Sequence, residues 1–209
     1  MLAFSSAASA APISFNITAA QFVPGAGYGV DSDEGSPDLL DVRFSTSLFI
    51  AQNFTFNAVN QTVSFSFGTI DLEEPDAHSG IAAGESDGLG ISAKLTFTAP
   101  TGVTQTVTAT GVATAGSVGD LAVDYVTNWS PVTVMFGNGG SFQISLNDLA
   151  FDDRGTQTQT ATVRFLSFPD DSPVALPESP TPVPEPGSLL LSGSGLVGAG
   201  VRRWRKRRV

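Results

Sequence analysis

The sequence VTVMFGNGGSFQISL, residues 132–146, places two alternating apolar segments on either side of a glycine-rich turn. Apolar side chains recur at every second position: Val132, Val134 and Phe136 before the turn, and Phe142, Ile144 and Leu146 after it. Successive side chains of a β-strand point to opposite faces, so this spacing predicts two half-buried strands. Gly137-Asn138-Gly139-Gly140 between them is typical of a hairpin. The stretch therefore predicts an antiparallel hairpin with one face toward a core.

The same two-residue period recurs through residues 13–168, with no helical stripe. Further apolar faces are predicted at Val42, Phe44, Leu48 and Ile50; at Phe54 and Phe56; at Val63, Phe65 and Phe67; at Ile91, Ala93, Leu95 and Phe97; and at Ala161, Val163 and Phe165. A polar strand face, which we expect to be exposed, is formed by Thr104, Thr106, Thr108 and Thr110. About ten such strands predict an all-β fold, an antiparallel β-sandwich with jelly-roll or immunoglobulin-like topology.

Composition agrees with this fold and limits the chemistry. Phe occurs 15 times, and aromatic residues are enriched in β-strands. The absence of Cys excludes disulfides and thiolate metal sites. Residues 1–201 carry four basic residues against all 20 acidic ones, which gives a net charge of −16. Such a chain repels phosphate backbones, so nucleic-acid binding is not expected.

The chain divides into four predicted parts. Residues 11–168 form the sandwich domain, and residues 169–182 form a proline-rich linker that we expect to be an extended stalk. Residues 183–209 form a C-terminal signal. Residues 1–10 end in Ala8-Ser9-Ala10, which matches a signal-peptidase site, but no basic residue precedes it. We interpret residues 1–10 as the remnant of a signal peptide whose front lies upstream of Met1.

The C-terminal signal has three consecutive parts. A short motif, Val183-Pro184-Glu185-Pro186, is followed by the uncharged span 187–201, GSLLLSGSGLVGAGV. The basic residues of 202–208 come next: Arg202, Arg203, Arg205, Lys206, Arg207 and Arg208. A transmembrane helix of this span would cover roughly 22 Å, against about 30 Å of hydrocarbon, so it is a weak permanent anchor. We expect a short C-terminal transmembrane helix that is recognised in the membrane and then removed.

These three parts resemble a PEP-CTERM sorting signal, with Pro184, Glu185 and Pro186 matching its motif. The resemblance implies processing by an exosortase, a membrane transpeptidase, in a bacterium that makes exopolysaccharide. The body is similar to the choice-of-anchor domains that accompany this signal, through residues 24–34, 40–42, 65–68 and 85–89. That second resemblance implies no activity.

Acidic residues gather in the predicted loops and suggest one metal site. Calcium binds six to eight oxygen ligands, and Asp31, Asp33 and Asp38 lie together in one such loop. The EF-hand pattern fails there, because Gly35 comes one place early and the twelfth position is Val42. Two interpretations stay open: a calcium site at a sandwich end, or solvated acidic loops.

No residue set predicts catalysis. His78 is the only histidine and lies in a polar loop, and Trp129 is the only tryptophan of the body, which limits sugar stacking. We therefore expect no enzyme activity and no cofactor other than calcium. We expect an exported protein of the cell envelope, membrane-anchored and then located at the surface or in the extracellular matrix, with a structural or adhesive role in exopolysaccharide. The alternative is a carbohydrate-binding module or glycoside hydrolase that acts on that polysaccharide.

Overall fold

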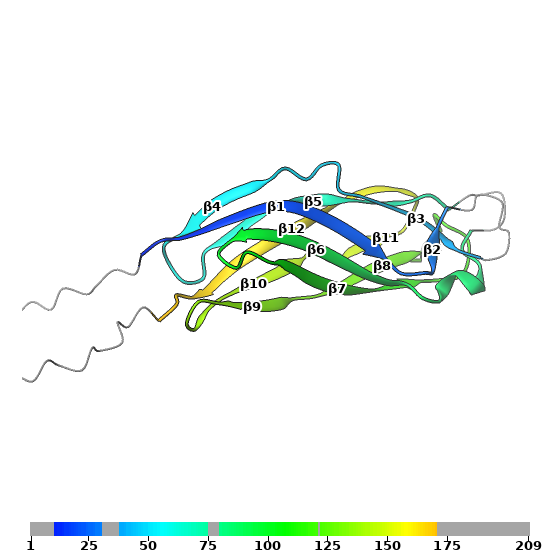
Figure 1. Cartoon of the computed structure of the whole chain (residues 1–209). Coiled ribbons are helices and arrows are strands. Elements are labelled where there is room, and N and C mark those ends of the chain that lie inside the picture. Colours follow the sequence, from blue (N-terminus) through cyan, green and yellow to red (C-terminus); the bar gives the residue numbers. More distant parts are fainter. Residues whose placement is uncertain (1–10, 31–37, 75–79, 121, 171–209) are drawn as a thin grey trace, which may run out of the picture. The chain divides into compact units, whose positions relative to one another are not determined.

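The computed structural model describes residues 11–30, 38–74, 80–120 and 122–170. This part of the chain consists of β-strands and one short 3-10 helix, η2 (Ala83–Ser86) (Figure 1). The strands are β1 (Ile13–Pro24), β2 (Tyr28–Gly29), β3 (Leu40–Ser45), β4 (Gln52–Phe56), β5 (Thr62–Leu72), β6 (Gly90–Ala99), β7 (Thr104–Ala113), β8 (Tyr125–Ser130), β9 (Val132–Phe136), β10 (Gly140–Leu146), β11 (Leu149–Phe151) and β12 (Gly155–Ser167). The all-β prediction is confirmed.

The strands form two six-stranded sheets. Sheet 1 has the order β11-β8-β7-β6-β1-β4, and sheet 2 has the order β2-β3-β5-β12-β10-β9. All neighbouring strands pair antiparallel except β2 and β3, which pair parallel. In Figure 1, β1 begins and β12 ends at the same end of the two sheets.

The apolar faces of the two sheets pack against each other, and Phe15 of β1 lies at the centre of this contact. Its ring, which is fully buried, meets Phe142 edge to face at 5.0 Å between ring centroids. Phe136 and Phe165, also of sheet 2, contact the same ring. Phe56 of sheet 1 contacts it at 5.1 Å. Aromatic pairs in this geometry stabilise a core beyond their buried area, so Phe15 holds the two sheets together.

The predicted hairpin at residues 132–146 is confirmed. β9 and β10 pair antiparallel with Phe136 opposite Gly140 and Val134 opposite Phe142. Gly137 and Gly139 of the connecting turn have φ values of 53° and 81°, a backbone region that residues with a Cβ rarely adopt. The alternation therefore fixed the buried face, and the two glycines allow the reversal.

The alternation also gives the buried faces of β6 and β12. Ile91, Ala93, Leu95 and Phe97 are buried in β6, and Ala161, Val163 and Phe165 are buried in β12. β5 is more complex, since Phe65 and Phe67 are buried in its first half and Ile70 and Leu72 in its second. A shift in the pairing of β5 with β12 leaves Phe67 without an opposite residue. This β-bulge moves the buried face by one position.

The predicted strand face of Val42, Phe44, Leu48 and Ile50 is wrong beyond Phe44. β3 ends at Ser45, where the Ser45 hydroxyl accepts a hydrogen bond from the Ser47 backbone N–H at 3.2 Å. Serine side chains that bond to nearby backbone groups favour turns over strands. Leu48 and Ile50 are consequently 51% and 75% exposed.

The strand order also differs from an immunoglobulin constant domain. Three successive strands, β6, β7 and β8, lie side by side in sheet 1. The ABED and CFG sheets of that domain contain no such run of three. Apolar alternation indicates which face of a strand is buried and carries no information about which strands are neighbours. The jelly-roll alternative stays a prediction.

Most predicted segments outside the sandwich lie outside the described residues. These are the signal-peptide remnant at 1–10, residues 171–182 of the linker and the whole signal at 183–209, including the predicted span 187–201. Within the described residues, no helix has the length and apolar character that a membrane crossing requires.

Candidate functional site

The outward face of sheet 1 carries mostly polar and small side chains, with Val112 of β7 as an exposed apolar exception. We call it the threonine face and define it by Ala19, Gln21 and Val23 of β1, Ser92, Lys94 and Thr96 of β6, Thr104, Thr106, Thr108 and Thr110 of β7, and Asn128 and Ser130 of β8. It exists because these positions alternate with buried ones, such as Val107 and Ala109 of β7. Threonine suits such a strand because it is β-branched. The prediction that the β7 threonines are exposed is confirmed.

Antiparallel pairing aligns the threonine face into rows that cross the strands. One row runs Gln21, Lys94, Thr106 from β1 through β6 to β7. The next runs Ala19, Thr96, Thr104, and within it the Thr96 and Thr104 hydroxyls form a hydrogen bond of 3.1 Å. Rows that align directly across a sheet place the side chains about 5 Å apart, within reach of one ligand.

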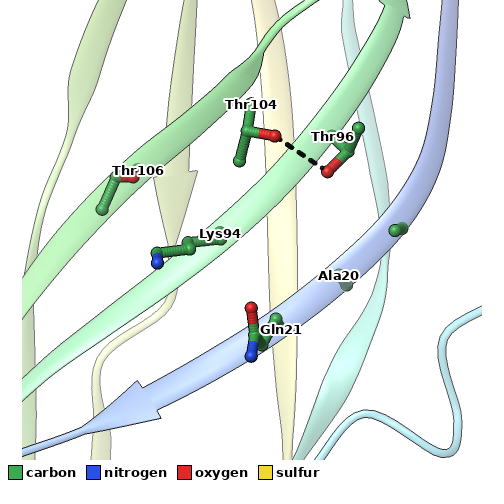
Figure 2. Close-up of a pocket in the computed structure, with 7 residues that line it drawn as sticks. Ala20, Gln21, Lys94, Thr96, Thr104 and Thr106 are labelled. Carbon is green, nitrogen blue, oxygen red and sulfur yellow. Dashed lines mark hydrogen bonds between the residues drawn. The ribbon is translucent and has the colours of Figure 1, made fainter.

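A groove of about 490 Å³ lies over these two rows (Figure 2). It is lined by Ala19, Ala20, Gln21, Lys94, Thr96, Thr104 and Thr106. Figure 2 shows Lys94 on the middle strand, with Gln21 on the strand to one side and Thr106 on the strand to the other. The lining thus offers one cation, one amide and three hydroxyls from three adjacent strands.

Lys94 is the only charged residue in the six strands of sheet 1, which contain no Asp or Glu. Two other cations of the described chain have partners: Arg43 pairs with Glu73 at 2.6 Å, and Arg164 donates to Asn60 Oδ1 at 2.7 Å. Lys94 takes part in no hydrogen bond or ion pair with another described residue. Its ammonium group therefore faces solvent in the groove, in a chain that is otherwise strongly acidic.

The predicted calcium ligands are only partly placed. Asp31 and Asp33 lie outside the described residues, and Asp38 is exposed beside Gly84. Within the described segments, no group of three or more His, Cys, Asp or Glu side chains is close enough to hold a metal ion. The calcium site stays a prediction.

Three acids from the predicted loops, Asp41, Glu74 and Glu85, are buried, so for these residues the alternative of solvated loops is wrong. Glu74 is 0% exposed, and its Oε1 accepts a hydrogen bond from the Asp41 backbone N–H at 2.7 Å. Glu85 is 1% exposed, and its Oε2 accepts from the Ala82 backbone N–H at 2.6 Å. Hydrogen bonds to backbone N–H groups offset part of the cost of burying a polar side chain, so Glu74 and Glu85 have a structural role.

Trp129, the one tryptophan among the described residues, has a structural role. Trp129 is buried, and its Nε1 donates to Gln159 Oε1 at 3.1 Å, so it provides no surface for sugar stacking. His78 lies outside the described residues.

Tyr28 and Tyr125 form a buried pair that the sequence does not indicate. Their phenol oxygens are 2.8 Å apart, and Tyr28 donates to the Leu89 carbonyl oxygen at 2.9 Å. Burial raises the pKa of both phenols far above the ordinary value. The two residues are 97 positions apart in the chain, so no local pattern could have revealed the contact.

Comparison with known proteins identifies one segment. Residues 182–208 match the family model of the PEP-CTERM protein-sorting motif. The match contains Val183-Pro184-Glu185-Pro186, the span 187–201 and the basic residues 202–208. No curated protein and no solved structure matches the chain, so the resemblance of its body to choice-of-anchor domains stays a prediction. The PEP-CTERM motif implies export, exosortase-dependent processing and sorting to the cell envelope.

Proposed function

We propose that this chain is an exported protein of the cell surface or extracellular matrix, with a structural or adhesive role in exopolysaccharide. The sorting motif at residues 182–208 carries the proposal. It follows a β-domain whose last strand, β12, ends at Ser167, and the segment between them is rich in proline. A proline-rich segment is extended and semi-rigid, so it would hold the domain away from its attachment point.

The tail is proposed to act as a transient membrane stop. Its span of 187–201 is short and contains five glycines, whereas the basic residues that follow favour a cytoplasmic end. Such a segment would hold the chain long enough to present Pro184-Glu185-Pro186 at the outer interface. An exosortase would then remove the span and the basic residues.

Substitution of the motif tests this proposal in the native host. The variant P184A/E185A/P186A should keep its C-terminus and accumulate in the membrane fraction, whereas the wild-type protein should reach the surface or the matrix. The matched control P177A/E178A/P180A removes the same residue types from the linker and should sort normally. Normal sorting of the motif variant, or equal failure of both variants, would contradict the proposal.

A second candidate function is a carbohydrate-binding module, and the groove on the threonine face favours it. Amide and hydroxyl groups hydrogen-bond readily to sugars, and the groove presents four of them in two rows. A glycoside hydrolase would need two carboxylates flanking the sugar, about 5–9.5 Å apart. The groove lining contains no carboxylate, and we therefore propose binding without hydrolysis at this site.

A further inference from the structure

The strands of sheet 1, which line the groove, differ in charge from the rest of the chain before its basic tail. The chain before its basic tail has a net charge of −16, yet no strand of sheet 1 contains an acidic residue. A surface that only needed to be soluble would not have to exclude carboxylates from all six strands. The exclusion leaves Lys94 as the only charge among these strands, and no neighbouring strand residue neutralises it.

The groove lining restricts the class of ligand. Nucleic acid and anionic membranes require several cations, and the strands of sheet 1 provide one. An apolar partner would require exposed apolar side chains, whereas the lining is composed of alanine, threonine, glutamine and lysine. Hydroxyl and amide groups in regular rows suit a ligand that itself carries many hydroxyl groups. The lysine adds a preference for one anionic group.

We propose that this groove binds a single chain of an acidic polysaccharide, with Lys94 pairing with a sugar carboxylate. Gln21, Thr104 and Thr106 would hydrogen-bond to the sugar hydroxyls, since they flank Lys94 in the same row or in the next one. The inference deepens the proposed adhesive role in exopolysaccharide. Sugar binding is measured on purified protein and sorting is measured in the host, so failure of one is distinguishable from failure of the other.

The groove is expected to bind weakly and reversibly. It contains no aromatic side chain for stacking, and an exposed ion pair lowers a dissociation constant only about two- to five-fold. The groove lining contains no carboxylate, and charges more than about 8 Å apart are largely screened at physiological salt, so only an acidic group close to the groove would repel the ligand. Many copies of the protein bound along one polysaccharide chain would together attach that polymer more strongly than one copy does.

Titration with matched oligosaccharides tests the proposal. The probe is a hexamer of β-1,4-linked mannuronate, and its neutral control is a hexamer of β-1,4-linked mannose, which differs in carrying no carboxylate. The protein is the full chain with the six basic residues of 202–208 changed to Gln, because these could also attract an anion. Backbone amide shifts in NMR spectra report both affinity and location.

The expected shifts lie in β1, β6 and β7, and the uronate should bind more tightly than the neutral hexamer. K94Q should weaken uronate binding about two- to five-fold, and K94E should weaken it further, because it replaces attraction with repulsion. T104V/T106V removes two hydroxyls while keeping the β-branched shape, and it should weaken both sugars about three- to ten-fold.

R164E is the matched control for K94E, since it makes the same change of charge on β12 of sheet 2. It should leave uronate affinity within two-fold of the reference. The proposal is overturned if no amide shifts at millimolar uronate, if the shifts lie outside β1, β6 and β7, or if R164E weakens binding as much as K94E. Equal affinity for the two hexamers would also overturn it.

Discussion

Raising the pH above 10 should unfold the β-domain through its buried tyrosine pair. Tyr28 donates its hydroxyl hydrogen to the Leu89 carbonyl oxygen at 2.9 Å, so Tyr125 must donate to the Tyr28 oxygen at 2.8 Å. The folded state therefore needs both phenols protonated. Desolvation by burial is the main cause that raises the pKa of each phenol well above its value of 10.0 in an unfolded chain.

The size of the effect follows from proton linkage. Below pH 10, both phenols are protonated in the folded and the unfolded state, and the stabilisation is complete. Above pH 10, the unfolded chain releases two protons that the folded domain retains, so the free energy of unfolding falls by about 2.7 kcal/mol per pH unit. Between pH 10 and pH 12 the loss is about 5 kcal/mol, which is comparable to the whole stability of a marginal domain.

The assay uses the fact that these are the only two tyrosines in the chain. Tyrosinate absorbance should stay low as the pH rises through 10 and 11, and should increase together with loss of the β-sheet circular dichroism signal. Y125F removes one of the two titrating groups, so the pH dependence of the unfolding free energy should fall by about half. An absorbance midpoint near pH 10 with intact circular dichroism would refute the reasoning, because it would show that the phenols are accessible.

Three further perturbations test the packing and the metal hypothesis. F15A should lower the free energy of unfolding by about 3–5 kcal/mol in a urea titration, because it leaves a cavity where five other phenylalanine rings meet; a loss below 1 kcal/mol would contradict the central role of Phe15. I50S should change the free energy of unfolding by no more than about 0.5 kcal/mol, since Ile50 is 75% exposed; a larger loss would show that Ile50 is buried after all. If Asp31, Asp33 and Asp38 bind calcium, millimolar calcium should raise the Tm of the wild-type protein and not of D38N; an unchanged Tm in both would end the calcium hypothesis.

The sequence predicts which strand faces are buried more reliably than how the strands are ordered. Phe142, Ile144, Val163 and Phe165 alternate without interruption, and the structure buries all four. The alternation failed at Leu48 and Ile50, where a serine turn interrupts the strand while the apolar spacing continues by coincidence. Strand neighbours depend on long-range packing of the whole chain, which a period of two residues does not encode.

The polar residues were harder to interpret than the apolar ones. Glu74 and Glu85 lie in acidic stretches that favoured solvated loops. The Glu74 carboxyl accepts from the Asp41 backbone N–H, 33 positions away, which only the fold brings to it, whereas the Glu85 carboxyl accepts from the Ala82 backbone N–H three positions before it. Lys94 appeared in the sequence as one polar position of a strand. Its significance comes from the absence of acids in the other strands of sheet 1, which is visible only once the sheet order is known.

The mass of the mature protein from its native host tests the proposal of exosortase-dependent sorting. The account predicts that intact-mass measurement will place the C-terminus near Pro186, with the span 187–201 and the basic residues 202–208 absent. The same protein made in an expression strain without an exosortase should keep its tail, which separates enzymatic removal from nonspecific proteolysis of the proline-rich linker. A native protein that still carries residues 202–209 on most molecules would contradict the account and would identify the tail as a permanent anchor.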